Sequence, residues 1–321
     1  MNISLSRWIS LLVLLVLILS ACTQTTTHLK SQKQQFIDDV TFISQMPRIS
    51  GELHHKKVQA LCASRFKQLG FEVELHDYGT GINVIGIYPG KQSPSEIVMV
   101  SAHYDTVLNC NGADDNASGI AAVFETARIL SAKQHDRTLV LACWDEEEKK
   151  VVGSRAYAER EKNNATDIKM SYVYEMIGYT NKQANSQQVP AGFERLYPEQ
   201  VKDIASQQNR ADFIALIYDD KASDMLSTIA FHAEQQELPI FQFKVSSQLK
   251  KSPAIKDLRR SDHSAFWDVD YPAMMVTDTA NFRNPHYHCA EGEDTIHTLD
   301  VDFAIKTINT LAATIEDNLM N

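Results

Sequence analysis

The sequence predicts an α/β fold, namely a single three-layer α/β/α domain with a mixed, mostly parallel central sheet and helices on both faces. Short apolar segments typical of strands alternate with longer segments whose apolar residues recur at helical spacing. Some strand segments, such as 138-TLVLACW-144, are apolar throughout, which is typical of central strands covered on both faces. The sequence of 321 residues contains no evident internal repeat and no clear second domain.

The predicted elements follow one another from residue 35 onward. Apolar residues at helical spacing predict a first helix from Phe36 to Met46, which Pro47 ends, and a second from Val58 to Leu69, which Gly70 ends. The strands that follow are predicted at 71–78, 83–89, 96–104, 138–144, 168–175, 212–218, 239–245 and 272–278. The remaining helices are predicted at 117–132, 153–162, 222–237 and 300–318. The polar stretch 181–211 has little periodicity, and we interpret it as a surface insertion that covers part of a cleft.

The N-terminal segment is apolar and ends at a cysteine. The run 9-ISLLVLLVLILSAC-22 suits either the apolar part of a signal sequence or a membrane anchor. Its last four residues resemble the lipobox of bacterial lipoproteins, which implies a signal peptide at 1–21, an acylated Cys22 and a polar tether at 22–34. Because Thr23 rather than Asp follows, the resemblance implies an exported lipoprotein of the outer membrane that faces the periplasm. Acyl chains on Cys22 would hold it to the lipid bilayer.

The charge balance excludes one class of partner. The formal net charge is −10, and no stripe of Lys and Arg is visible along the chain. Nucleic acid is therefore not expected as a partner, because phosphate binding needs clustered basic side chains.

Four segments hold metal-binding types of side chain, and each lies where a predicted strand ends, which is where ligands of open α/β sheets gather. They are His103-x-Asp105, Gly112-Ala-Asp-Asp-Asn116, 145-DEEE-148 and 284-NPHYHCAEGEDT-295. Taken singly, the first is also explained as a solvated strand end, the second as a helix N-cap and the third as a solvated acidic turn. Four consecutive acids that repel one another also suit a bound cation.

Together these segments resemble the secreted zinc aminopeptidases with two co-catalytic metals, the bacterial leucyl aminopeptidase type, to which glutaminyl cyclases are related. Five motifs of that family occur here in order, and the resemblance covers about residues 35–321. The motifs are His103-Tyr-Asp105, Gly112-Ala-Asp-Asp-Asn-Ala-Ser-Gly119, Glu147-Glu148 five residues before Gly153-Ser154, Glu175-Met-Ile-Gly178 and Tyr287-His288. The resemblance implies that residues 35–321 form a zinc peptidase catalytic domain.

The resemblance also implies a ligand set for two Zn²⁺ ions. Asp115 would bridge both ions and would be joined to Asn116 by a cis peptide bond. One ion would be completed by His103 and Glu175, and the other by Glu148 and His288. Oxygen and imidazole ligands without thiolate suit zinc.

Three further residues receive roles. Counting back from Gly153 in the family pattern makes Glu148 the ligand and Glu147 the general base. Asp105 can orient His103, because a ligating histidine usually donates its second ring N–H to a carboxylate or carbonyl. Tyr287 matches a tyrosine of the family that stabilises the oxyanion, and packing beside His288 is the alternative.

The implied activity is that of a metal-dependent exopeptidase, an aminopeptidase that hydrolyses N-terminal residues of peptides through a metal-activated water. One alternative is a glutaminyl cyclase, which uses a single zinc held at positions matching Asp115, Glu148 and His288. Another is a non-catalytic binding lipoprotein on the same scaffold. The presence of His103 and Glu175 favours hydrolysis over both alternatives.

Some positions depart from the family pattern or lack a role. Glu175 stands where the best-known members have Asp, and Lys150 replaces a common Gly and is expected to pair with the extra acids. Asp114 needs no role beyond capping a helix.

Among the cysteines, Cys143 is interpreted as a buried thiol in a strand. A disulfide between Cys110 and Cys289 stays open, although both lie beside the site motifs and an exported chain can form one.

Overall fold

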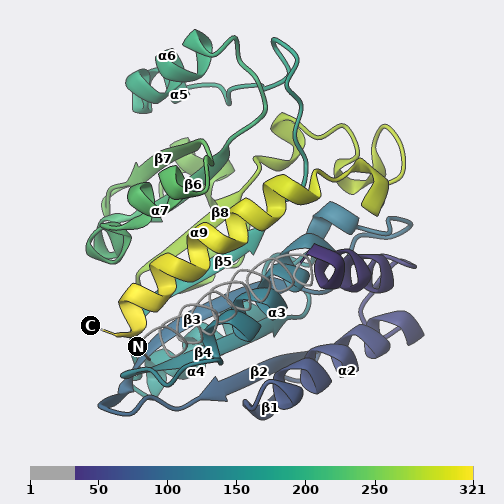
Figure 1. Cartoon of the computed structure of the whole chain (residues 1–321), viewed down its shortest axis with the longest axis vertical. Helices are drawn as coiled ribbons and strands as arrows, with labels where there is room; N and C mark the ends of the chain where they lie inside the picture. The colour runs from purple at the N-terminus through teal and green to yellow at the C-terminus, as the bar shows by residue number, and fades with distance from the viewer. Residues whose placement is uncertain (1–32, 321) are drawn as a thin grey trace, which may run out of the picture.

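The computed structural model describes residues 33–320, in which one twisted sheet is covered by helices on both faces (Figure 1). The expected signal peptide at 1–21, the acylated Cys22 and nearly all of the tether at 22–34 lie outside the described residues. Within residues 33–320, no helix has both the length and the apolar character needed to cross a bilayer.

The eight described strands form a single mixed sheet in the order β1-β2-β4-β3-β5-β8-β6-β7. The strands β4, β3, β5 and β8 run parallel to one another at its centre, and β6 pairs with β7 in parallel but with β8 antiparallel. This arrangement confirms the predicted mixed, mostly parallel sheet. The bounds are β1 (Glu72–Asp77), β2 (Ile82–Tyr88), β3 (Ser93–His103), β4 (Arg137–Trp144), β5 (Asp167–Glu175), β6 (Ile214–Asp219), β7 (Ile240–Val245) and β8 (Ala273–Thr277).

The helices cover the sheet much as the sequence predicts, with one clear exception. Residues 33–43 are helical, and the helices that follow are α2 (Leu53–Gln68), α3 (Gly119–Leu130), α4 (Val152–Asn163), α5 (Phe193–Leu196), α6 (Pro198–Ser206), α7 (Ile229–Gln235), α8 (His263–Asp268) and α9 (Val301–Leu319). The helix predicted at 222–237 is only seven residues long, because short 3₁₀ turns replace its first half. Ser223, Asp224, Ser227 and Thr228 occupy that half, and such side chains compete for backbone hydrogen bonds in helices.

Residues of the central strands alternate between two cores. Leu139, Leu141 and Cys143 of β4 belong to the core shared with α2, α3 and α9. Val140 and Trp144, on the opposite face of the same strand, pack with residues of α4, α6 and α8. A parallel strand buried on both faces has this apolar run, and the central strands are therefore rigid supports for whatever follows their carboxyl ends.

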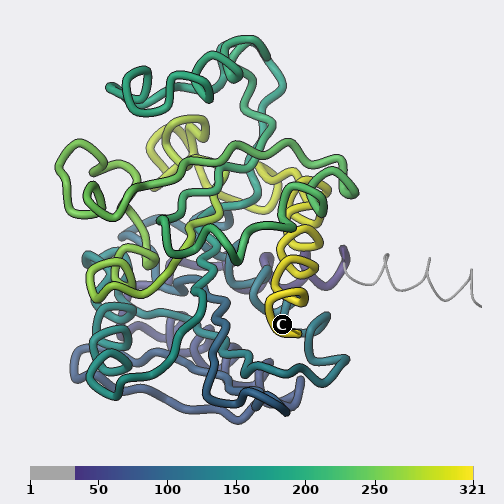
Figure 2. The backbone as a smooth tube through the Cα atoms, turned by 90° about the vertical axis from the view of Figure 1, so that its left-hand side faces the viewer, coloured from purple at the N-terminus to yellow at the C-terminus, as the bar shows by residue number. Residues whose placement is uncertain are grey.

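The polar stretch 181–211 folds into α5, α6 and connecting loops. Figures 1 and 2 both place α5 and α6 at one end of the molecule, beyond the sheet. Residues of this stretch, among them Gln187, Phe193 and Ile204, line a cavity next to strands β6, β7 and β8.

Two disulfides join distant parts of the described chain. Cys110 is bonded to Cys289, which confirms the pair that the sequence left open. Cys62 is bonded to Cys143, so the interpretation of Cys143 as a buried thiol is wrong. The reason is the pleat of β4, which turns Cys143 toward the face of the sheet on which α2 carries Cys62.

Candidate metal centre

The candidate ligands come from the carboxyl ends of four neighbouring parallel strands. His103 is the last residue of β3, and Glu175 is the last residue of β5. Glu147 and Glu148 follow β4, and His288 lies in the segment after β8. Asp115 lies between β3 and α3, in the segment Ala113–Ser118, where its own backbone is not helical (φ −103°, ψ 88°). The chain therefore converges at one edge of the sheet, as expected for open α/β folds.

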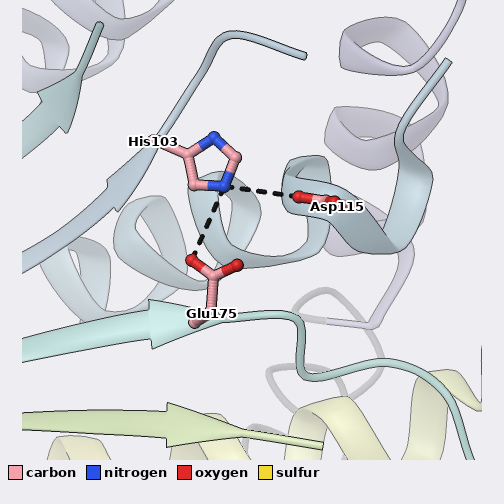
Figure 3. Close-up of side chains that lie close together, drawn as sticks. All are labelled: His103, Asp115 and Glu175. Carbon is pink, nitrogen blue, oxygen red and sulfur yellow. Dashed lines mark ion pairs between the residues drawn. The ribbon is translucent and has the colours of Figure 1, made fainter. Parts of the chain in front are cut away.

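One group of candidate ligands consists of three buried side chains. His103, Asp115 and Glu175 are buried, and their side chains point toward one another (Figure 3). The Nε2 atom of His103 lies 3.3 Å from Oδ1 of Asp115 and 3.5 Å from Oε2 of Glu175. We call this group the inner half of the centre.

A second group shares Asp115 with the first. The Nε2 atom of His288 lies 3.3 Å from Oδ2 of Asp115 and 3.3 Å from Oε2 of Glu148. We call Asp115, Glu148 and His288 the outer half. One oxygen of Asp115 faces the inner half and the other faces the outer half, which is the geometry that a bridging carboxylate requires.

These donors suit zinc in type and in spacing. Two atoms about 2.0 to 2.1 Å from one tetrahedral zinc ion are about 3.3 to 3.4 Å apart. The observed separations of 3.3 to 3.5 Å agree with that value. The buried atoms His103 Nε2 and Glu148 Oε1 also have no hydrogen-bond partner among the described residues. Buried polar atoms are normally satisfied, so an ion would supply the interaction that these two lack.

The backbone around Asp115 is fixed by residues from both ends of the chain. The Asp115–Asn116 peptide bond is cis, as the resemblance implied. The backbone N–H groups of Asp114 and Asp115 donate to the carboxylate of Asp294, at 2.9 and 3.0 Å. The buried guanidinium of Arg48 donates to the carbonyl oxygens of Gly112 and Asp115, at 2.9 and 3.4 Å.

Sequence reasoning missed Arg48 and Asp294 as supports of the centre. Arg48 follows the proline that ends the first helix, and Asp294 lies six residues after His288. Neither stands in a pattern typical of a site, and only the fold brings them to residues 112–115. An Asp in the His288 segment was a weak signal for Asp294.

Asp114 does not cap a helix, contrary to expectation. No side chain caps the Ala113–Ser118 segment, and Asp114 is fully buried. Its carboxyl oxygens accept hydrogen bonds from the backbone N–H of Gly178 and from Nδ2 of Asn284, at 2.9 and 2.7 Å. Burial, reinforced by the neighbouring Asp278, raises the pKa of Asp114 well above its ordinary value. Asp114 therefore ties the Asp115 segment to the loops after β5 and β8.

The four consecutive acids after β4 divide by direction. Glu147 and Glu148 turn toward the centre, and Oε2 of Glu147 lies 4.0 Å from Nε2 of His103. Asp145 turns away and accepts hydrogen bonds from Tyr104 and His55, at 2.9 and 2.7 Å. This division agrees with the count from Gly153 that selected Glu147 and Glu148.

Glu146 also turns away, and its partner is not the expected one. It accepts hydrogen bonds from Thr80 and from Lys149, at 2.6 and 2.9 Å. Among the described residues, no ion pair involves Lys150, so the expectation that Lys150 pairs with the extra acids is wrong. Lys150 has a left-handed backbone with φ 77°, and it lines the metal pocket instead.

Asp105 connects the inner half to the acidic loop. The Nδ1 atom of His103 lies 3.4 Å from Oδ1 of Asp105. The backbone N–H groups of Glu147 and Glu148 donate to the two carboxylate oxygens of Asp105, at 3.0 and 3.2 Å. One carboxylate therefore faces His103 and holds the loop that carries Glu147 and Glu148.

Burial and mutual interactions shift the pKa values of the acids and histidines in the centre. Burial would raise the pKa of Asp115, but the nearby imidazole groups of His103 and His288 hold that pKa below its ordinary value. Although burial lowers it, hydrogen bonds with Asp115 and Glu148 raise the pKa of His288 to about 10. Burial raises the pKa of Glu147 well above its ordinary value, with Glu175 adding to the effect. Cations are therefore strongly favoured here, and binding a metal would displace protons from the histidines.

Tyr287 lies at the mouth of the centre. Its ring stacks on that of His288, with centroids 3.8 Å apart, and its hydroxyl accepts a hydrogen bond of 2.9 Å from Arg260. Tyr287 and Arg260 border two spaces at once. One is the metal pocket, lined also by Asp115, Glu147, Glu148, Glu175 and His288. The other is an apolar cavity, lined by Phe193, Ile204, Phe213, Phe243 and Met275 among others.

The sequence and the fold both match known proteins. Residues 83–233 match Peptidase family M28. The uncharacterized protein YfbL of Escherichia coli K12 is 29% identical over 223 residues, which are 64% of this chain and 62% of that protein. A probable zinc metalloprotease of Pyrenophora tritici-repentis is 26% identical over 231 residues, 69% of this chain and 47% of that protein. The chain thus spans less than two thirds of the length of these relatives.

Solved structures share the fold. The LapA aminopeptidase of Legionella pneumophila superposes with a TM-score of 0.67 at 16% identity, covering 93% of this chain and 75% of that one. BSAP, a zinc aminopeptidase from Bacillus subtilis, gives 0.67 at 14% identity, covering 90% and 95%. A glutaminyl cyclase of Fimbriiglobus ruber gives 0.60 at 15% identity, covering 88% and 94%. Residues 83–233, which contain four of the five ligand positions, are thus similar to Peptidase family M28, and the fold of the chain is similar to that of the solved aminopeptidases.

Proposed function

We propose that this protein is a zinc-dependent aminopeptidase that removes N-terminal residues from peptides. The observation that carries the proposal is the pair of ligand groups sharing Asp115, each with 3.3 to 3.5 Å between donor atoms. His103, Asp115 and Glu175 would hold one Zn²⁺, and Asp115, Glu148 and His288 would hold the second. Bound there, zinc supplies Lewis acidity toward a carbonyl oxygen and lowers the pKa of a water.

The side chains around the ligands supply the proton transfers. Glu147 lies beside the ligands without belonging to either group, and its pKa is raised by burial. It would accept a proton from the attacking water at a carboxylate oxygen and then donate that proton to the nitrogen of the leaving amine. The Tyr287 hydroxyl accepts from Arg260, so its own proton is free to be donated to the oxygen on which negative charge develops.

Removal of an N-terminal residue fits the shape of the site. The apolar cavity opens beside Glu175 and Tyr287, and its walls are mostly apolar, with Phe193, Phe213 and Phe243 among the lining side chains. An apolar side chain at the N-terminus of a substrate would be buried there. The free amine would then lie against the acidic cluster, which includes Glu147 and Glu175.

The decisive experiment compares Glu147→Gln with the unaltered protein. Glutamine keeps the size of the side chain but cannot accept a proton, so we expect kcat for leucine p-nitroanilide to fall by about 10²- to 10⁴-fold. Zinc content, measured by mass spectrometry of the elements, should not change, since Glu147 is not among the candidate ligands. Equal kcat in both proteins would remove Glu147 from the mechanism.

A peptide panel tests the substrate end. Aminoacyl, N-terminally blocked and Gln-leading peptides should be incubated with and without a chelator. We expect cleavage of free N-termini only, and only without the chelator. Cleavage of blocked but not free N-termini would contradict the aminopeptidase proposal.

Glutaminyl cyclase activity is the second candidate, because a glutaminyl cyclase shares the fold. The presence of both His103 and Glu175 in the inner half supports hydrolysis instead, since two metal ions can then be held. One tightly bound zinc per chain, with release of a cyclised product from Gln-leading peptides, would favour the cyclase.

We also propose that the protein works outside the cytoplasm, attached to the bilayer through Cys22. The two disulfides support export, because such bonds persist in oxidising compartments. Labelling with radioactive palmitate, abolished in a Cys22→Ala variant, is the expected result.

A further inference from the structure

Four basic side chains border the metal pocket of a chain whose formal net charge is −10. We call them the cationic rim; they are Lys150, Arg155, Arg259 and Arg260. Lys150 belongs to the loop that carries Glu147 and Glu148, and Arg155 lies in the first turns of α4. Arg259 is the last residue of the 3₁₀ segment Pro253–Arg259, and Arg260 follows it, before α8.

Two members of the rim have partners that explain them. Arg259 pairs with Asp268 at 2.7 Å. Arg260 donates to the Tyr287 hydroxyl at 2.9 Å and to Oδ1 of Asn281 at 2.7 Å. These two arginines are therefore already paired with neighbouring side chains of the protein.

Lys150 and Arg155 have no such explanation. Both side chains are exposed. Within residues 33–320, neither has a carboxylate within ion-pair distance or makes a side-chain hydrogen bond. They do not neutralise the acidic ligands either, because no ion pair joins them to Asp115, Glu147 or Glu148. Two free cations thus stand on one wall of the pocket in which a substrate would react.

The position of this wall relative to the apolar cavity indicates which part of a substrate it meets. Lys150 and Arg155 line the metal pocket but not the apolar cavity, whereas Glu175 and Tyr287 line both. If the N-terminal side chain fills the apolar cavity, the peptide crosses the centre and its remaining part lies toward Lys150 and Arg155. That remaining part is the leaving group of the hydrolysis.

We propose that Lys150 and Arg155 bind a carboxylate on the leaving group of the substrate. The substrates would then be short peptides with a free C-terminal carboxylate close to the cleaved bond, or peptides with an acidic side chain there. This inference rests on the proposed function, since it assumes that an N-terminal residue is removed at the adjacent centre. It assigns the two residues to substrate binding, with an effect on KM rather than on the chemical step.

The first test uses the unaltered, zinc-loaded protein and three substrates. They are leucyl-glycine, leucyl-glycinamide and the α-amide of leucyl-glutamate, whose only carboxylate is that of the glutamate side chain. We expect the two carboxylate-bearing peptides, or one of them, to show a KM about three- to tenfold lower than that of the neutral amide. Which of the two gains identifies the source of the carboxylate. The preference should shrink with added salt, because the cations are exposed. Equal KM for all three substrates would overturn the proposal.

The second test changes the residues. In a Lys150→Gln/Arg155→Gln variant the carboxylate preference should disappear, while the zinc content and the circular dichroism spectrum match those of the unaltered protein and report an intact fold. The matched control is Lys56→Gln, which removes an exposed charge on α2 that does not line the metal pocket. A preference that survives in the double variant, or disappears in the control, would contradict the assignment.

A binding measurement separates this inference from the proposed activity. Calorimetry on the Glu147→Gln background should show tighter binding of leucyl-glycine than of its amide, with the difference lost when Lys150 and Arg155 are also changed. If leucyl-glycine binds more tightly than its amide but the unaltered protein turns over no peptide, the carboxylate site is supported and the aminopeptidase proposal is contradicted. If the unaltered protein turns over all the peptides but calorimetry shows no difference in binding, the aminopeptidase proposal is supported and the carboxylate site is contradicted.

Discussion

The inner and outer halves of the candidate metal centre share Asp115 but are built differently. The inner half uses the last residues of two central strands, and the side chain of His103 is 0% exposed. The outer half uses the loop after β4 and the segment after β8, and the side chain of His288 is 34% exposed. The inner half is therefore held by the sheet, whereas the outer half depends on loops and on what ties them down. Rigidity and access are divided between the two.

The largest effect is expected from the residue that both halves share. Asp115→Asn keeps the size of the side chain but removes the charge that faces both histidines. Removing a residue that hydrogen-bonds to a metal ligand lowers metal affinity or activity about 10- to 100-fold. Removing a ligand that both ions share should lower kcat/KM by more than that. Elemental analysis should find both ions depleted. Asp167→Asn, at the opposite end of β5, is the control, and one fully retained ion in Asp115→Asn would show that the halves are independent.

Asp105→Asn tests whether the halves are coupled through a second carboxylate. The variant weakens the interaction with His103 in the inner half and with the backbone N–H groups of Glu147 and Glu148 beside the outer half. We expect metal affinity and kcat to fall by about 10- to 100-fold, as for other residues that orient ligands. Chelator titration followed by zinc content gives the affinities. A change confined to one of the two ions would mean that Asp105 serves only that half.

The Cys110–Cys289 disulfide allows the outer half to be loosened selectively. Cys289 is adjacent to His288, and the bond ties this segment to the loop before Gly112. A Cys110→Ser/Cys289→Ser variant should lose about 2 to 5 kcal/mol of unfolding free energy, measured with urea. It should also release one ion at a lower chelator concentration, by a smaller shift than in Asp105→Asn.

The second disulfide provides the matched control. Cys62→Ser/Cys143→Ser removes a bond between α2 and β4, neither of which contains a candidate ligand. We expect it to lower stability but to leave chelator sensitivity as it was. Identical chelator curves for the two double variants would show that the outer half does not depend on its disulfide.

The smallest effect concerns acid and the support of the inner half. His263 of α8 follows the Ser261-Asp262 pair, and Ser261 donates to Glu175 at 2.7 Å. Burial lowers the pKa of His263 to about 3. In the unfolded chain His263 has an ordinary pKa near 6.5. Below that pH the unfolded chain therefore binds a proton at His263 that the folded protein does not bind. The contribution to stability is therefore complete above about pH 6.5 and is lost as the pH falls toward 3.

This linkage has a measurable size. Between pH 7 and 5 the unaltered protein should lose about 2 kcal/mol more unfolding free energy than His263→Gln, which does not titrate. Urea unfolding at the two pH values measures the difference. Parallel losses in both proteins would show that another group dominates the acid sensitivity.

Much of the fold and of the candidate site could be predicted because the signals are local. Apolar runs marked the central strands, and the residues just after them were the metal-binding types. The choice of Glu147 and Glu148 over Asp145 and Glu146 came from the resemblance, in whose motif the second glutamate lies five residues before the Gly that matches Gly153.

The features that were missed depend on contacts between distant segments. Arg48 and Asp294 meet the Asp115 segment only after folding, and the partner of Cys143 is set by the pleat of β4 against α2. Lys149 rather than Lys150 reaches Glu146, because the backbone at Lys150 turns left-handed. No sequence window contains that information.

The Asp294 carboxylate also has a bearing on the order of biogenesis. It holds the backbone of Asp114 from 180 positions further along the chain. A polypeptide emerging from a ribosome or a translocon presents its bridging aspartate long before that acceptor exists. We expect the metal centre to form only when nearly the whole chain has been synthesised. A nascent or truncated polypeptide would therefore have no hydrolase activity inside the cell that makes it.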